Sequence, residues 1–178
     1  MERAFLMKKI LKSMLNHNPV LGSLIGWFYQ YLSFLSPFPL LVNDKYIVAL
    51  SHPTPSYRDH ILILPKKRIK TFYDLTDFCF LDHILTSVRR LCENRFPGIE
   101  KSLLVNGGIR QEIMQLHFHL IDREENRIGN DKKSVKIEYD DDALANVKNL
   151  MKEEMKLQKG FTLVFDLNRG NEMTIYFV

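Results

Sequence analysis

The sequence predicts an α+β fold in which helices pack on a mainly antiparallel sheet. Two observations lead to this fold class. Apolar stretches of strand length, rich in β-branched residues, are separated by short loops that contain proline, glycine or charged residues. An amphipathic segment of helical length lies between them, and a second helix and a hairpin follow. The expected strands are 45–50, 60–64, 102–105, 113–121, 161–167 and 173–178, and the expected helices are 76–96 and 140–159.

Proline, glycine and acidic residues mark the ends of the first elements. Two prolines within residues 52–57 make this segment a loop between the first two strands. Helix 76–96 is capped by Thr76 or Asp74 and is closed by Pro97-Gly98. Its buried face is expected to consist of Phe78, Leu81, Ile84, Leu85, Val88, Leu91 and Cys92.

The second half follows the same logic. Asn106-Gly107-Gly108 forms a turn after the third strand, and the charged residues 122–131 form a loop. The C-terminal helix begins with Asp140-Asp141-Asp142 and carries lysines towards its end, an order that favours the helix dipole. Gly160 ends that helix, and residues 168–171 turn the hairpin.

Composition limits the class of protein. The 178 residues suffice for one domain with a core and an appendage, and the formal net charge of +4 suits phosphate ligands or an anionic surface. Cys79 and Cys92 lie about 20 Å apart along the expected helix, too far for a disulfide. Neither belongs to a CxxC metal motif, so both are interpreted as structural thiols of a reducing compartment. No internal repeat is visible.

Residues 1–38 form a basic and apolar helical extension. Residues 13–43 contain no Asp, Glu, Lys or Arg, and residues 20–35 are dense in apolar and aromatic side chains until prolines stop the helix. A basic cluster precedes them: Arg3, Lys8, Lys9 and Lys12. On helical spacing, the small or polar residues form one narrow stripe: Gly22, Gly26, Tyr29, Gln30 and Ser33.

Two interpretations of this extension remain open. Its apolar run is about 16 residues, short of the roughly 20 that span a bilayer, and no small-residue cleavage site follows it. One interpretation is a helix lying in a membrane interface through residues 8–36, held there by Trp27, Phe28 and Tyr31. The other is a helix docked on the domain or across a dimer.

Residues 115–121, QLHFHLI, carry the candidate chemistry. In a strand, side chains alternate between faces, so Gln115, His117 and His119 are expected to share one face. The residues between them are apolar and face the core, which fixes the register. His60 is interpreted as a structural residue at the start of a strand.

Three segments in sequence order resemble the histidine-triad (HIT) nucleotide-binding family. DKYIVALSHPTPSYRDHILILPKKRI, residues 44–69, is similar to the ribose-binding loop of that family and its following strand. VNGG, residues 105–108, resembles the turn whose amide contacts phosphate, and RQEIMQLHFHLI, residues 110–121, matches the histidine strand. The resemblance implies that residues 39–178 form a HIT-like domain with a C-terminal helix and hairpin.

The chain departs from the family pattern at several positions. Gln115 replaces the first histidine of the triad, so the motif reads QxHxH. Glu112 stands where the family has a hydroxyl residue that assists the leaving group, and a carboxylate there repels phosphate. His52 stands where the family has an acidic residue that grips the sugar hydroxyls.

The resemblance implies a role for each matched residue. His117 attacks the α-phosphorus, and His119 donates to the phosphate oxygens. Asn106, Gln111, Gln115 and His52 are expected to bind the substrate: these are the phosphate turn, a glutamine common in the family, the triad position and the ribose loop. The route implies no cofactor, and no dedicated metal site is evident.

The expected function is therefore a nucleotide phosphohydrolase or nucleotidyl transferase with a nucleotidyl-histidine intermediate. Two alternatives stay open: a divergent nucleotide-binding module with little turnover, and a membrane-associated interaction protein with an inactive site. The expected partners are a nucleotide or nucleotide conjugate, a second copy in a homodimer, and a membrane surface, with no specific nucleic acid. The expected location is the cytoplasm, peripherally on the inner face of a membrane.

Overall fold

The structure is a computed structural model of the whole chain. It describes residues 19–36, 38–53, 55–123, 134–138, 142–156, 160–167 and 172–177. The basic cluster upstream of residue 13, the acidic start of the C-terminal helix and the hairpin turn at 168–171 lie wholly or largely outside these residues.

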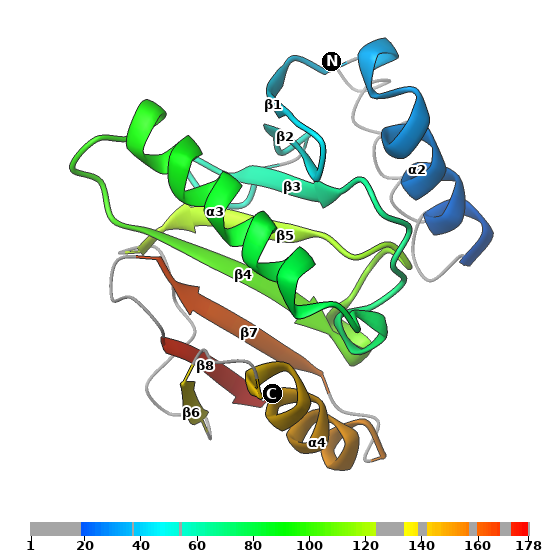
Figure 1. Cartoon of the computed structure of the whole chain (residues 1–178), viewed down its shortest axis with the longest axis vertical. Helices are drawn as coiled ribbons and strands as arrows, with labels where there is room; N and C mark the ends of the chain where they lie inside the picture. The colour runs from blue at the N-terminus through cyan, green and yellow to red at the C-terminus, as the bar shows by residue number, and fades with distance from the viewer. Residues whose placement is uncertain are drawn as a thin grey trace.

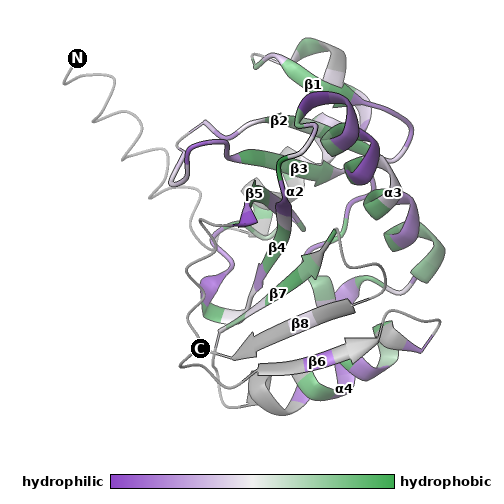
Figure 2. Cartoon of the chain, turned by 90° about the vertical axis from the view of Figure 1, so that its left-hand side faces the viewer, coloured by the Kyte–Doolittle hydropathy of each residue, from purple (hydrophilic) through white to green (hydrophobic). Residues whose placement is uncertain are grey.

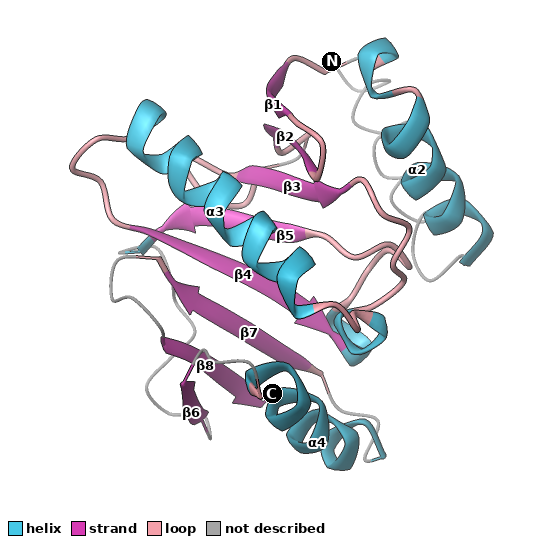
Figure 3. Ribbon diagram, viewed as in Figure 1, coloured by secondary structure: helices cyan, strands magenta, loops and turns pink. Residues whose placement is uncertain are grey.

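One eight-stranded sheet organises the molecule (Figure 3). Its strands lie in the order β1-β2-β3-β5-β4-β7-β8-β6, and the neighbouring pairs with a described register are antiparallel. The strands are β1 (Leu40–Asn43), β2 (Ile47–Ser51), β3 (Ile61–Pro65), β4 (Lys101–Gly107), β5 (Phe118–Asp122), β6 (Ser134–Glu138), β7 (Phe161–Asp166) and β8 (Glu172–Phe177). The α+β fold class predicted from the sequence is confirmed.

Helix α3 (Phe78–Arg95) covers one face of the sheet (Figure 1). Its apolar stripe is buried against the inward residues of β2, β3, β4 and β5, and this contact forms the main core. The N-cap is Asp77, whose carboxylate accepts from the Phe80 amide at 3.0 Å, so the cap expected at Thr76 or Asp74 was placed too early. Asp74 instead closes a capping box with Thr71 on the preceding 3-10 turn.

Helix α2 (Pro19–Tyr31) lies on the opposite face of the sheet, against β3. Tyr29 packs in a cluster with Val48, Leu50 and Leu64, and Phe28 flanks it. The small or polar stripe identified in the sequence therefore faces inward at Gly26, Tyr29 and Ser33, which are buried. A docked helix, one of the two interpretations of this segment, is what the structure shows for residues 19–31.

Gly26 allows α2 to approach the histidine segment closely. A Cβ at this position would lie 2.2 Å from the Gln115 Oε1 and 2.8 Å from its Cδ. The Gln115 side chain is only 1% exposed, and its Oε1 has no hydrogen-bond partner among the described residues. The helix backbone therefore covers Gln115, two positions before His117.

The C-terminal unit extends the sheet from β4. Strand β7 pairs with β4 from Ser102↔Asp166 to Gly107↔Phe161. Gly107 provides the room for this contact, because a Cβ there would lie 1.9 Å from the Phe161 ring. Helix α4 (Ala143–Lys156) adds Leu144 and Val147 to the core.

The two halves of the sheet repeat one topology. β3-α3-β4-β5 and β6-α4-β7-β8 have the same order of elements, and each places its last strand between the other two. The β4–β7 pair joins these halves edge to edge in one sheet (Figure 1). The second half lacks histidine in β8 and lacks counterparts of β1 and β2 among the described residues. The two halves therefore share the pairing of their strands but not the residues that those strands carry.

Several element boundaries differ from the sequence-based expectation. The fourth strand was expected to begin at Ile113, but β5 begins at Phe118 because residues 113–115 bend beneath α2. Strands β1 and β6 were not expected; β1 is short and β6 lies between charged segments. Apolar residues are concentrated along the central strands (Figure 2). Among the described residues, no helix combines the length and apolar character needed to cross a bilayer.

The close approach at Gly26 predicts an unusual response to alanine. Gly→Ala in a helix ordinarily stabilises by about 0.5–1 kcal/mol. Here Gly26→Ala is expected to lower the free energy of unfolding by about 1–2 kcal/mol, because the methyl group overpacks against Gln115. Adding Gln115→Ala removes the obstacle, and the double variant should regain part of the loss in urea unfolding. Simple additivity of the two substitutions would contradict the contact.

Candidate functional site

The His117 ring is held by a backbone carbonyl. Its neighbours Leu116 and Phe118 are buried in the core, which turns the imidazole to the opposite face of the sheet. The Leu116 amide donates to the Ile69 oxygen at 2.6 Å and anchors this segment. The His117 Nδ1 lies 2.8 Å from the backbone carbonyl oxygen of Gln115, and a carbonyl oxygen can only accept a hydrogen bond. Nδ1 therefore carries the proton, and Nε2 presents a lone pair.

A second hydrogen-bonded chain fixes the His119 tautomer. The Ser56 amide donates to the His60 Nδ1 at 3.3 Å, so in neutral His60 the proton lies on Nε2. That Nε2 lies 2.8 Å from the His119 Nδ1 and donates to it. Neutral His119 therefore carries its own proton on Nε2. Two residues apart on one face, His117 offers a nitrogen lone pair and His119 offers an N–H group.

Four imidazoles gather at this place. The His117 and His119 ring centroids lie 5.0 Å apart, and the His60 ring lies 5.0 Å from the ring of His119. His52 stacks on His60 with a centroid separation of 4.0 Å and an interplanar angle of 10°. Tyr57 meets the His60 ring edge-on. His60 was interpreted as a structural residue, yet it is the hydrogen-bond donor to a site histidine.

Burial keeps these rings neutral. Desolvation, reinforced by His52 and His117, lowers the pKa of His60 to about 4. Desolvation and the neighbouring histidines hold the pKa of His119 well below its ordinary value. Desolvation also lowers the pKa of His117, against the opposing effects of the Gln115 carbonyl and Glu112. A neutral imidazole is the form that acts as a nucleophile.

The histidine cluster does not fit a metal ion as it is arranged. His52, His60 and His119 each bring a ring nitrogen within 4.8 Å of the others. A ligating nitrogen points its lone pair in the ring plane, and zinc sits about 2.0–2.1 Å away. The His52 and His60 rings are parallel and stacked, so one ion cannot lie in both planes. The His60 Nε2 is also directed at His119.

Asn106 is oriented by a residue of the C-terminal unit. The Thr162 hydroxyl donates to the Asn106 Oδ1 at 2.8 Å and accepts from the Arg110 guanidinium at 2.9 Å. The Thr162 bond engages the Asn106 amide oxygen and leaves the amide N–H groups for an acceptor, and the Arg110 bond holds the Thr162 hydroxyl in place. Asn106 shares its sheet face with Leu104, the register partner of His119. The amide is therefore placed on the histidine side.

The two glutamines are used within the protein. The Gln111 side chain is 3% exposed, and its amide donates to the carbonyls of Lys70 and Ile113 at 2.6 and 2.8 Å. The Gln115 amide lies beneath Gly26, 3.4 Å from the Lys67 carbonyl. Both side chains brace the loop before the histidines, so their predicted contact with substrate requires that loop to open. Glu112 is exposed on the same loop.

A family comparison covers this region. Residues 36–126, about half of the chain, match the HIT domain.

The chain belongs to the HIT domain family.

The chain is similar to several known proteins. An uncharacterized HIT-like protein of Methanocaldococcus jannaschii is 30% identical over 95 residues, which are 50% of this chain and 71% of the relative. A HIT family hydrolase from Legionella pneumophila is 28% identical, with a TM-score of 0.46, covering 58% of this chain and 96% of its own. The structure of yeast Ap4A phosphorylase in complex with AMP is 11% identical, with a TM-score of 0.49, and the match covers 76% of this chain and 57% of the phosphorylase.

The site extends beyond the HIT match at Thr162. This residue and Arg110 were not expected to contribute, because their connection to Asn106 depends on the β4–β7 pairing. His60 could have been found from the sequence. His60, Leu62 and Leu64 occupy alternate positions and therefore share one face, which lies opposite the main core.

The Thr162 hydroxyl predicts an isosteric test of Asn106. Thr162→Val removes the proton that fixes the amide oxygen while keeping the buried shape. Losing one such hydrogen bond should weaken nucleoside monophosphate binding about threefold to tenfold in titration calorimetry. Thr162→Ser keeps the hydroxyl and serves as the matched control. Equal losses in both variants would show that packing, not the hydroxyl, matters.

The neutral histidines predict lower stability in acid. Because the pKa of folded His60 is about 4 against an ordinary 6.5, the unfolded chain binds more protons between these values. Stability is full above about pH 6.5 and falls toward pH 4, by at most about 1.4 kcal/mol per pH unit for each such histidine. Urea unfolding across this range should show a shallower dependence for His60→Gln than for the unmodified chain. An identical dependence would refute a neutral His60.

Proposed function

We propose that the protein is a nucleotide phosphohydrolase or nucleotidyl transferase that acts at the α-phosphate through a nucleotidyl-histidine intermediate. One observation carries this proposal. The His117 Nδ1–H is bound to the Gln115 carbonyl, so the lone pair of Nε2 is free to attack. Family membership supports the proposal, since the residues matched include both histidines.

The proposed reaction has two displacements at phosphorus. In the first, the Nε2 lone pair of His117 forms a bond to the α-phosphorus, and the bond to the leaving group breaks with its electron pair. The imidazole then carries the phosphoryl group on Nε2 and the proton on Nδ1, and the Gln115 carbonyl stabilises its positive charge. In the second, water or an acceptor alcohol attacks phosphorus, Nε2 leaves with its pair, and the attacking oxygen releases a proton.

Two neighbouring donors support charge at the phosphate. His119 directs its Nε2–H toward the nonbridging oxygens, with its position set by His60. Asn106 offers its amide N–H groups from β4. His52 stacks on His60 and is the proposed contact to the sugar. The proposed substrate is a nucleotide or nucleotide conjugate.

A nucleotide-binding module with little turnover is the second candidate. Gln115 cannot transfer a proton, and its amide is buried beneath α2. Desolvation lowers the pKa of His117, and the negative charge of Glu112 acts against that lowering, so this charge lies close enough to repel a phosphate bound at His117. Both features slow phosphoryl transfer without removing the binding groups. An interaction protein with an inactive site is the third candidate and would bind no nucleotide.

We also propose a homodimer and a peripheral location on the cytoplasmic side of a membrane. The described sheet ends at β1 and β6, so two copies that join their sheets would pair one of these strands. Strand β4 is closed to a second copy because β7 of the same chain pairs with it. The N-terminal segment, residues 8–36, is the proposed contact with the membrane surface.

Covalent labelling tests the proposed function. Incubation with a nucleoside phosphoramidate or dinucleoside polyphosphate labelled at the α-phosphate, followed by an alkaline quench, should leave label on the protein. His117→Ala should abolish the label, because the attacking nitrogen is gone, whereas His83→Ala on the exposed side of α3 should retain it. Tight nucleotide binding without label or product supports the binding module. Label that persists in His117→Ala excludes the proposed nucleophile.

A further inference from the structure

Helix α2 exposes an apolar stripe to the outside. Val20, Leu24, Trp27 and Tyr31 are 68%, 53%, 49% and 60% exposed. Their spacing of four, three and four residues places them on one side of the helix. Leu35 and Phe38 continue the exposed apolar surface beyond the helix end. The contiguous set of large apolar side chains distinguishes α2 from an ordinary surface helix.

This outer stripe is not needed to hold α2 on the domain. The inner side of the helix is seated through Gly26, Tyr29 and the neighbouring Phe28, which contact Gln115 and the strand residues of β2 and β3. An ordinary docked helix turns its apolar side inward and its polar side to water. Here Gly26 and Tyr29 are buried against the domain, and a second, apolar side of the helix is exposed and left for another contact.

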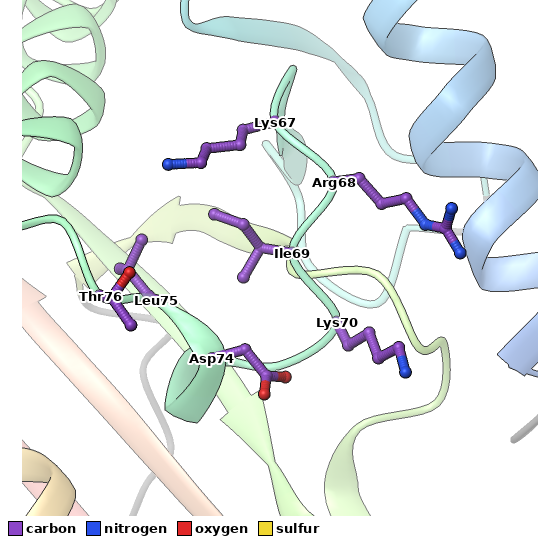
Figure 4. Close-up of a pocket in the computed structure, with 7 residues that line it drawn as sticks. All are labelled: Lys67, Arg68, Ile69, Lys70, Asp74, Leu75 and Thr76. Atoms are coloured by element: carbon purple, nitrogen blue, oxygen red, sulfur yellow. The ribbon is translucent and has the colours of Figure 1, made fainter.

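The charge around the stripe favours an anionic surface. Residues 13–43 contain no Asp, Glu, Lys or Arg. Arg68 extends from the loop after β3 toward α2, and Lys70 projects from the same loop (Figure 4). Lys67 points the other way, and its ammonium lies 3.9 Å from the Asp77 carboxylate. The Gln115 contacts with Gly26 and the Lys67 carbonyl bring that loop and the helix together. Four further cations precede residue 13 in the sequence.

We propose that the outer stripe of α2 is a lipid-docking face for an anionic bilayer surface. Trp27 and Tyr31 are side chains that favour the level of the headgroups, and Leu24 and Val20 enter the acyl boundary. Arg68 and Lys70 meet the anionic headgroups. A second copy packed on the same stripe would bring the two basic loops toward each other, which like-charge repulsion disfavours.

This inference deepens the proposed membrane contact and does not rest on the proposed chemistry. The inner side of α2 touches Gln115, and the Gln115 carbonyl holds the His117 ring. A bilayer-bound α2 therefore keeps the face of the sheet that carries the histidines close to the lipid surface. Docking itself requires no turnover.

Vesicle binding by the full chain tests the docking face. Trp27 is the one tryptophan, so its emission reports on this stripe directly. With phosphatidylcholine vesicles containing phosphatidylglycerol, the emission should shift to the blue and be quenched by brominated lipid. Pure phosphatidylcholine should bind more weakly, and added salt should reduce binding to the anionic vesicles.

Two variants at similarly exposed residues distinguish vesicle binding through the stripe from nonspecific hydrophobic adsorption. Leu24→Glu should weaken co-sedimentation with anionic vesicles by about tenfold or more, since an inserted leucine is replaced by a charge. Ile99→Glu, at a residue 47% exposed after α3, should bind as the unmodified chain does. Circular dichroism and thermal unfolding verify that both variants fold.

Three results would overturn the proposal. They are no binding to anionic vesicles, binding without a change in Trp27 emission, and equal binding by Leu24→Glu and the unmodified chain. A dimer in solution that Leu24→Glu dissociates would assign the stripe to a second copy instead. His117→Ala should bind vesicles normally. If the unmodified chain binds vesicles but takes up no label, the enzyme alone is rejected; if it is labelled but does not bind vesicles, the docking face alone is rejected.

Discussion

The hydrogen bond from the His117 Nδ1 to the Gln115 carbonyl is the interaction on which the site depends. It decides which ring nitrogen has a lone pair, and it requires residue 115 to bend away from strand geometry just before β5 begins. The bend is held from several sides: Gln111 binds two loop carbonyls, Leu116 binds the Ile69 carbonyl, and α2 lies over Gln115 at Gly26. The His117 ring is therefore positioned by backbone that the rest of the fold supports.

Two additions to the HIT match reach into this site. Helix α2, whose residues 19–31 precede the matched region, closes over Gln115, and Thr162 of β7, which follows it, orients Asn106. The C-terminal unit repeats the topology of the first half and extends its sheet at β4. Its contribution to the site is a hydroxyl rather than a second set of histidines. Family resemblance alone would therefore describe only part of the candidate site.

The sequence predicted the fold class, the α3 face and the paired histidines because these depend on local periodicity. It did not predict β1 and β6, since a strand of four residues and one set among charged residues leave a weak pattern. Thr162 depends on the β4–β7 pairing and leaves no local signal. Gln115 and Gln111 were assigned to substrate by their position in the motif, whereas their side chains are buried in contacts with the protein. The alternation of side chains along β3 places His60 on the histidine side of the sheet. Its position at the start of the strand led instead to a structural interpretation.

The tautomers of the histidine rings test the central claim most directly. Two-dimensional NMR of the ¹⁵N-labelled imidazoles at neutral pH distinguishes a protonated nitrogen from one with a lone pair. The structure predicts neutral His117 with its proton on Nδ1, and neutral His60 and His119 with theirs on Nε2. His117 protonated on Nε2, or present as imidazolium, would contradict it.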